Sequence, residues 1–179
     1  RCVTGKVARQ QNVGALHLPL SDVGVVALDY RGVDGIATSI GHAPVEALID
    51  PRAGSRLSIA EALTNIVFAP LTHGLSGVSL SANWMWPCRN EGEDARLYSA
   101  VEAVSQFAIE LGVNVPTGKD SLSMTQKYKD GTKVIAPGTV IISAAGQVSD
   151  VKKTVSPYLR RGEGLDIVYV DFSGSERNL

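Results

Sequence analysis

The sequence is poor in cysteine, and the two cysteines that it has are poorly placed to work together. Cys2 and Cys88 lie far apart in the 179 residues and form no CxxC or Cys/His ligand spacing. This placement favours two free thiols in a reducing compartment over a disulfide. We therefore expect a cytoplasmic location.

The sequence also lacks an excess of charge and any long apolar run. Its 17 Lys and Arg residues nearly balance its 18 Asp and Glu residues, for a net charge of -1. Both signs are mixed along the chain, so the basic stripe of a nucleic-acid-binding protein is missing. No run is long enough to span a bilayer, and the start carries no signal-peptide pattern. We expect no nucleic-acid partner and no membrane partner.

The two ends of the sequence predict a piece of a longer protein. The chain begins at Arg1 without Met and stops soon after the strand-like run Asp166–Phe172. Its length suits one domain with a little of a second. A stretch with little periodicity, Asp150–Gly164, favours a domain boundary. We expect a first domain over residues 1–155, with a linker and the opening strand of the next domain over 156–179.

Hydrophobic patterning predicts a mixture of strands and helices. Strands are expected at Val23–Leu28, Val78–Asn83, Val113–Val115, Val140–Ala145 and Asp166–Tyr169. Helices are expected at 44–50, at 58–68 and after Asn90, where Asn90 and Glu93 suggest a capping box and Gly112 an end. Because the elements follow no strict βαβ rhythm, we predict an α+β (mixed α/β) fold rather than a doubly wound one.

One set of oxygen-bearing side chains has the composition of a metal site. Glu61 and Asn65 are four residues apart, so they share one helix face opposite the apolar stripe. Asp22 opens the strand at 23–28. Mg²⁺ takes carboxylate and amide oxygens of this kind and bridges nucleotide phosphates. The alternative is a polar helix face that only contacts water.

A second candidate is the glycine–lysine segment Thr117–Ser121, which follows the strand at 113–115. Glycine lets backbone N–H groups approach an anion, and Lys119 and Ser121 add a charge and a hydroxyl. The segment is no P-loop, because Val113 stands where the first glycine belongs and Asp120 replaces the Ser/Thr. The alternative is a turn between strands with a lysine at its tip.

Other residues allow two interpretations each. Trp84, Met85 and Trp86 either form an aromatic binding platform or pack in a core or at a domain interface. We expect packing, since large aromatics dominate such burial. Lys6 and Arg9 either contact a phosphate near Asp22 or lie on a solvated strand face.

Several long segments resemble one family, in the same order along the chain. They are GKVARQQNVG at 5–14 with PLSD at 19–22, SIAEALTN at 58–65, LSANWM at 80–85 and GKDSLSM at 118–124. These segments are similar to signatures of the large, single-chain phosphoribosylformylglycinamidine synthases (FGAM synthetases). The resemblance covers nearly the whole chain.

The resemblance implies a fold and a reaction. The fold is the N-terminal domain of the aminoimidazole ribonucleotide synthetase type, whose sheet pairs into a barrel with a homologous domain. The parent enzyme is an ATP-dependent ligase that makes formylglycinamidine ribonucleotide from formylglycinamide ribonucleotide, glutamine and ATP. The family's catalytic histidine motif and its glutaminase cysteine are not matched here. We therefore expect no catalytic residue and an inactive isolated chain, which needs the remaining domains and forms a homodimer without them.

The resemblance also assigns roles to residues. Asp22, Glu61 and Asn65 match Mg²⁺ ligands at an auxiliary site for ATP or ADP, and Gln11 and Asp22 face the nucleotide. Gly118, Lys119 and Ser121 match a loop that contacts the substrate phosphate. Two alternatives stay open: another ATP-using enzyme of the superfamily, such as aminoimidazole ribonucleotide synthetase, or a non-catalytic nucleotide-binding module that serves assembly.

Overall fold

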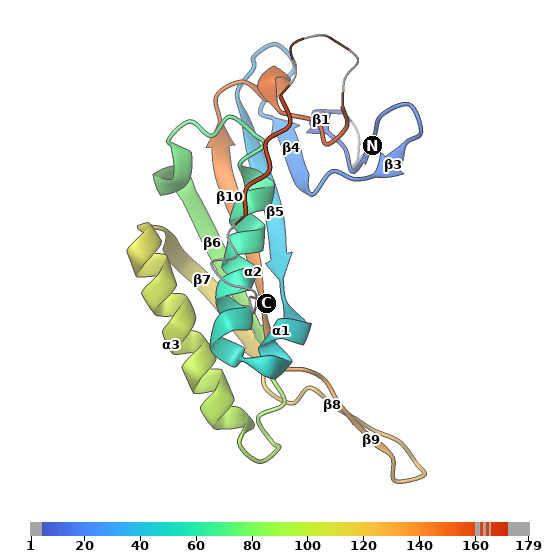
Figure 1. Cartoon of the computed structure of the whole chain (residues 1–179), viewed down its shortest axis with the longest axis vertical. Helices are drawn as coiled ribbons and strands as arrows, with labels where there is room; N and C mark the ends of the chain where they lie inside the picture. The colour runs from blue at the N-terminus through green and yellow to red at the C-terminus, as the bar shows by residue number, and fades with distance from the viewer. Residues whose placement is uncertain (1–4, 160–161, 163, 165, 172–179) are drawn as a thin grey trace.

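The chain folds around one large sheet with helices on one of its faces (Figure 1). The computed structural model describes residues 5–159, 162, 164 and 166–171. The six-stranded sheet has the order β1-β4-β5-β10-β6-β7. Its strands are β1 (Val7–Arg9), β4 (Val23–Ala27), β5 (Gly35–His42), β10 (Thr139–Val148), β6 (Val78–Met85) and β7 (Asn114–Ser121). The helices are α1 (Pro44–Ile49), α2 (Pro51–Ile66) and α3 (Glu93–Leu111), with short 3-10 turns at Gly74–Gly77 and Val151–Lys153.

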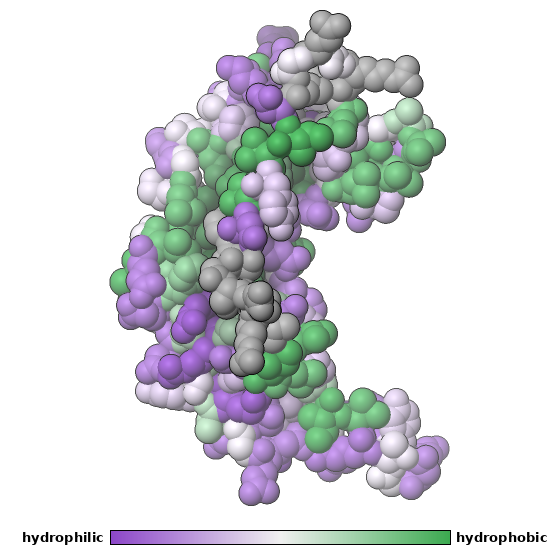
Figure 2. Space-filling model, viewed as in Figure 1, coloured by the Kyte–Doolittle hydropathy of each residue, from purple (hydrophilic) through white to green (hydrophobic). Residues whose placement is uncertain are grey.

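The sheet is antiparallel except at one edge. Only β6 and β7 pair in parallel, and α3 connects them. The last strand, β10, lies between β5 and β6, so it joins the two halves of the sheet. Two hairpins project from the body, β2 (Asn12–Val13) with β3 (Leu18–Pro19) and β8 (Thr125–Lys127) with β9 (Lys133–Ile135) (Figure 1, Figure 2). The architecture confirms the predicted mixed α/β fold.

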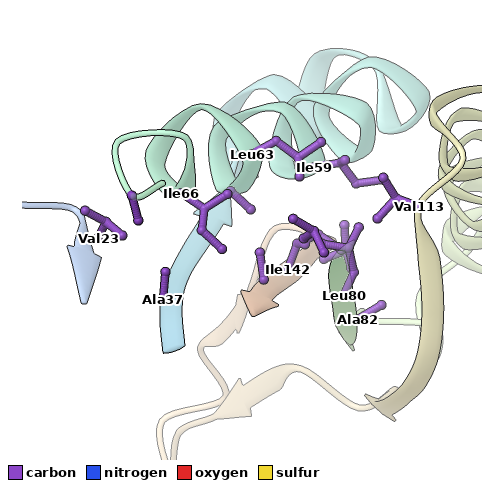
Figure 3. Close-up of a cluster of buried hydrophobic side chains, with 14 of the residues drawn as sticks. Val23, Ala37, Ile59, Leu63, Ile66, Leu80, Ala82, Val113 and Ile142 are labelled. Carbon is purple, nitrogen blue, oxygen red and sulfur yellow. The ribbon is translucent and has the colours of Figure 1, made fainter. Parts of the chain in front are cut away.

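The core lies between α2 and the sheet (Figure 3). Ile59, Leu63 and Ile66 point down from α2 onto Leu80 of β6 and Ile142 of β10. This packing confirms the predicted apolar stripe as far as Ile66, whereas Val67 and Phe68 follow the helix and are exposed. It also confirms the strands predicted near 23–28, 78–83 and 140–145. Apolar burial of this kind contributes about 25 cal/mol per Å², which makes it the main stabilising term.

Strand β5, which the apolar pattern did not predict, carries small residues on its buried face. Gly35, Ala37, Ser39 and Gly41 are buried, whereas Ile36 and Ile40 are exposed. A Cβ atom at Gly41 would lie 1.9 Å from the Ser58 carbonyl oxygen. The backbone of α2 therefore lies directly against the backbone of β5.

Helix α2 begins seven residues earlier than predicted. The carboxylate of Asp50 accepts hydrogen bonds from the backbone N–H groups of Arg52 and Ala53, at 2.8 and 3.2 Å. Pro51 follows at the first helical position, where its missing N–H is no loss. The same Asp50 ends α1, since its own N–H bonds to Glu46 O at 2.9 Å.

The capping box predicted for α3 is wrong. Gly92 occupies the N-cap with a φ of 79°, and the Glu93 carboxylate accepts a hydrogen bond from Trp86 Nε1 at 2.9 Å. Asn90 donates instead to Pro87 O at 2.8 Å. The other end of the helix is confirmed, because Gly112 takes a left-handed φ of 68° there. Trp86 is fully buried, as expected of core packing.

The strand predicted at Asp166–Tyr169 is not formed. Residues 166–171 have no regular structure, and the side chains of Ile167, Val168 and Tyr169 are exposed. A strand needs a neighbour for its backbone hydrogen bonds, and among the described residues none pairs with this segment. Phe172, also predicted in this strand, lies outside the described residues. No helix in the described part of the chain combines the length and apolarity needed to cross a membrane.

Candidate functional site

A cavity of about 770 Å³ brings the predicted metal and nucleotide residues together. Gln11, Asp22, Glu61 and Asn65 all line it, although they come from three separate parts of the chain. Hydroxyl groups from four strands of the sheet and from the residue pair before β4 form most of the remaining polar lining: Ser21, Thr38, Ser39, Ser79, Ser81, Thr117 and Ser143. Sequence reasoning missed these hydroxyls, although Ser79 and Ser81 show the period of two that marks one face of a strand.

The start of β4 positions Asp22. The register pairs Val23 with Ser39, so β5 extends past the beginning of β4 at Ile40 and His42. Asp22, the residue before β4, is therefore level with Ile40 at the edge of the sheet. Its side chain is exposed, which leaves the carboxylate accessible from the cavity.

Glu61 and Asn65 bond to the part of β5 that β4 leaves uncovered. Glu61 Oε2 accepts a hydrogen bond from the His42 backbone N–H at 2.6 Å, and Asn65 Nδ2 donates to Ile40 O at 3.1 Å. The two side chains thus take the place of a neighbouring strand. Within the described residues, Glu61 Oε1 and Asn65 Oδ1 have no further hydrogen-bond partner.

These oxygens fit a hard cation that is shared with a phosphate. Among residues 5–159 and the other described positions, no group of three or more His, Cys, Asp or Glu side chains is placed to hold a metal ion. Two carboxylates and one amide are too few for a closed all-protein cage. Mg²⁺ does not need one, because it keeps waters and takes phosphate oxygens alongside one or two carboxylates.

The neighbouring cationic side chains do not reach this cavity. Lys6 Nζ donates to Leu28 O at 2.7 Å. Arg9 donates to Thr154 O at 2.8 Å and to the Ser156 hydroxyl. Gln11 is held beside Asp22 because its carbonyl accepts the Ser21 N–H at 3.1 Å. Gln11 and Asp22 therefore line the cavity, whereas Lys6 and Arg9 do not.

The glycine–lysine segment is not a loop, which corrects the prediction for Gly118–Ser121. It is the second half of β7, and Gly118, Lys119 and Ser121 pair in parallel with Ala82, Asn83 and Met85 of β6. A Cβ at Gly118 would lie 2.6 Å from Ala82 O, so the close pairing requires glycine. Lys119 Nζ donates to Ser121 Oγ at 2.9 Å. The cavity is lined by Pro116 and Thr117 but by none of these three residues.

The fold of the described residues also occurs in solved structures. Two solved structures from Thermotoga maritima share the fold. PurL complexed with FGAR matches with a TM-score of 0.60 and 16% identity over 79% of this chain and 23% of that one. PurL complexed with ADP matches with a TM-score of 0.57 and 19% identity over 76% of this chain and 21% of that one.

Sequence comparisons identify the family. Residues 1–147 match the family model for the FGAR-AT PurM N-like domain, and the chain belongs to that family. Phosphoribosylformylglycinamidine synthase of Homo sapiens is 46% identical over 181 residues, which cover 100% of this chain and 13% of the relative. The probable chloroplastic/mitochondrial enzyme of Arabidopsis thaliana is 45% identical with the same coverage. The chain thus spans about 13% of the length of these relatives, and the resemblance inferred from the motifs is confirmed.

Proposed function

We propose that this chain works as one domain of an FGAM synthase. The whole enzyme is an ATP-dependent ligase that converts formylglycinamide ribonucleotide, glutamine and ATP into formylglycinamidine ribonucleotide. The names of the human and plant relatives support this assignment. So do the titles of the Thermotoga maritima PurL structures, which name complexes with FGAR, ATP and ADP.

Within that enzyme, the role of this domain is to hold a Mg²⁺–nucleotide complex. The observation that carries the proposal is the meeting of Gln11, Asp22, Glu61 and Asn65 in one cavity, with two of them fixed by backbone hydrogen bonds. Asp22, Glu61 and Asn65 would hold the metal, and Gln11 and Asp22 would face the ATP or ADP. When bound, Mg²⁺ neutralises the charge of the phosphates.

We propose a binding role for this site rather than a catalytic one. The described residues that line the cavity include neither a histidine nor a cysteine, and the resemblance assigns the catalytic histidine motif and the glutaminase cysteine to other parts of the enzyme. We expect no FGAM synthase activity from the 179-residue chain alone, even with ammonia as the nitrogen donor. Product formation above the blank would contradict this expectation.

Substitution of Glu61 tests the nucleotide site in the full-length enzyme. Glu61→Ala should release bound ADP and lower the melting temperature, since a ligand that binds only the folded state stabilises it by about 2.7 kcal/mol at a hundred times its Kd. Nucleotide content and melting curves are the measurements. Glu110→Ala is the matched control, because Glu110 lies on the exposed side of α3 and only accepts a hydrogen bond from Gln106. A Glu61→Ala enzyme that keeps its nucleotide and its melting temperature would refute the assignment.

We also propose that the uncovered face of the sheet pairs with the sheet of a homologous domain in the parent, forming a barrel. Val26, Ile36 and Ile40 are exposed on this face, and apolar area of this kind tends to be covered. In the isolated chain a second copy would take the partner's place, as a homodimer. Light scattering that shows only monomer at high concentration would argue against this pairing.

Three finer assignments complete the proposal. The domain boundary falls near residue 155, where the last 3-10 turn has ended. Gly118, Lys119 and Ser121 contact the substrate phosphate from β7. The enzyme acts in the cytoplasm, whereas the plant relative is named for the chloroplast and mitochondrion. An alternative role as a non-catalytic nucleotide-binding module would leave ADP binding intact but give no ATP turnover in the full-length protein.

A further inference from the structure

The segment that follows the 3-10 turn at Val151–Lys153 lies beside Asp22 and Asn65, at one side of the candidate site. Val155 N–H donates to Phe68 O, just after α2, at 2.8 Å. The ring of Tyr158 lies over the β2–β3 hairpin, since a Cβ atom at Gly14 would be 3.7 Å from Tyr158 Cγ. Residues 154–158, which we call the crossing segment, therefore contact both the helix and the hairpin that flank the candidate site.

The crossing segment also forms a wall beside two of the candidate ligands. A small cavity of about 70 Å³ is lined by Asp22 and Asn65 on one side and by Val155 and Pro157 on the other. The position of this segment thus determines how much room Asp22 and Asn65 have. A segment that moved outward would open the end of the site to water.

Arg9 is the residue that fastens the crossing segment to the sheet. Its guanidinium donates to Thr154 O at 2.8 Å and to the Ser156 hydroxyl, across 145 and 147 residues of sequence. Hydrogen bonds from a charged donor are about twice as strong as neutral ones. The Nε atom is buried without a partner among the described residues, so this side of the guanidinium is closed to solvent.

We propose that Arg9 is a positioning residue for the Mg²⁺–nucleotide site. It holds the crossing segment against β1 and thereby keeps the wall beside Asp22 and Asn65 in place. It does not contact the nucleotide. The inference rests on the function proposed above and adds a residue that acts on the site through another segment. Two other roles of Arg9 would predict different results. Arg9 could bind the phosphate directly, or it could stabilise the fold without affecting nucleotide binding.

The test measures the Kd for Mg·ADP in the full-length enzyme after removal of bound nucleotide. Arg9→Ala should raise the Kd about tenfold, as expected for the loss of charge-assisted hydrogen bonds. Ser156→Ala, which removes only one hydroxyl, should raise it about threefold. The double variant should bind no more weakly than Arg9→Ala alone, because both changes release the same segment. Calorimetric titration supplies all three values.

Two control variants separate positioning from charge. Lys6→Ala also removes a cation, one that donates to the Leu28 carbonyl. Because it leaves the crossing segment untouched, the Kd of this variant for Mg·ADP should equal the wild-type value. Arg9→Lys keeps the charge but not the two-pronged geometry, so it should bind ADP nearly as weakly as Arg9→Ala. A Lys variant with wild-type affinity, together with an unaffected Ser156→Ala enzyme, would instead identify a simple charge effect and overturn the proposal.

The remaining outcomes are also decisive. If Arg9→Ala lowers the melting temperature but leaves the Kd unchanged, Arg9 is only a brace and the inference fails. If Arg9→Ala does not fold, Ser156→Ala alone decides, and an unchanged Kd refutes the proposal. Glu61→Ala separates this failure from a failure of the proposed function. If the Glu61→Ala enzyme retains ADP, the site itself is refuted. If the Glu61→Ala enzyme releases ADP but the Arg9→Ala enzyme binds it normally, only the role of Arg9 is refuted.

Discussion

The two candidate regions differ in how their side chains are held. At the end of β5, Glu61 and Asn65 reach from α2 to backbone groups of another element, at His42 and Ile40. On β7, the outer strand of the described sheet, the Lys119 ammonium donates to the Ser121 hydroxyl, two residues away on the same strand. The first region is assembled by tertiary contacts, whereas the second is a local arrangement on an exposed strand.

This difference indicates which region tolerates change. Side chains fixed to a neighbouring backbone are pre-organised, so a ligand that binds them loses little entropy. They also depend on every contact that keeps α2 against β5. The exposed lysine of β7 depends on little else, so its substitution should affect ligand contacts without affecting the fold.

The largest expected effect comes from separating α2 and β5. Gly41→Ala places a Cβ atom 1.9 Å from Ser58 O and 2.5 Å from Ala62 N. Because both atoms belong to the helix backbone, the helix must shift, at a cost of about 3 kcal/mol for such overpacking. Urea unfolding of the chain measures this loss. Gly162→Ala is the control, since nothing lies within 4 Å of a Cβ there. Equal stability of the two variants would show that α2 does not depend on this contact.

A smaller effect, on ligand affinity alone, is expected at β7. Lys119→Ala in the full-length enzyme should raise the KM for formylglycinamide ribonucleotide about tenfold, because one charge-assisted contact to phosphate is lost. ADP content and melting temperature should not change. Asp120→Ala is the matched control, since adjacent residues of a strand point to opposite faces. A KM that stays at the wild-type value would remove β7 from the substrate site.

A third substitution tests a single hydrogen bond between α2 and β5. The buried Ser39 hydroxyl donates to Ala62 O at 2.6 Å, and Ser39→Ala should lower the free energy of unfolding by about 1 kcal/mol. Thr64→Ala also removes a hydroxyl that bonds a carbonyl of α2, but an exposed one. Its effect should be within about 0.5 kcal/mol of zero. The same urea titrations compare them, and equal losses would mean that burial of the bond is irrelevant.

The smallest effect concerns the thiol that follows β6. Burial raises the pKa of Cys88 above its ordinary value, and the carboxylates of Asp94, Glu93 and Asp120 raise it further. Since the thiolate is the reactive form, iodoacetamide should modify Cys88 more slowly than a free thiol at neutral pH, and faster as the pH rises. Asp120→Asn should accelerate the reaction less than twofold, because Asp120 is the weakest of these influences. Peptide mass spectrometry gives the rates, and a fast reaction at neutral pH would contradict the raised pKa.

Much of the fold could be predicted from apolar periodicity. Strand β5 could not, for a physical reason. The stripe of α2 was visible because Ile59, Leu63 and Ile66 are large. The buried face of β5 consists of glycine, alanine and serine, and its isoleucines face outward. Because α2 approaches so closely, only small residues fit, and the usual link between apolar character and burial is reversed there.

The candidate site was predictable in its residue types but not in its support. The spacing of Glu61 and Asn65 placed both on one helix face, and Asp22 was correctly placed at the start of a strand. Their anchoring depends on the register between β4 and β5, which leaves Ile40 and His42 uncovered. No sequence pattern states how far one strand extends past its neighbour. The prediction for Gly118–Ser121 failed in the same way: the sequence did not show that β7 continues along β6 as far as Ser121.

The position of β10 has a consequence for how the chain is made. β5 and β6 each offer one edge to β10, yet β10 is the last strand in the part of the chain that the structure describes. During synthesis from the N-terminus, both edges must wait unpaired until residues 139–148 have left the ribosome. Unpaired edges are where chains aggregate, so this interval is the most vulnerable stage in the life of the domain. If synthesis stopped before residue 139, the chain would contain β1, β4 and β5 in one half-sheet and β6 and β7 in another, with no strand to join them.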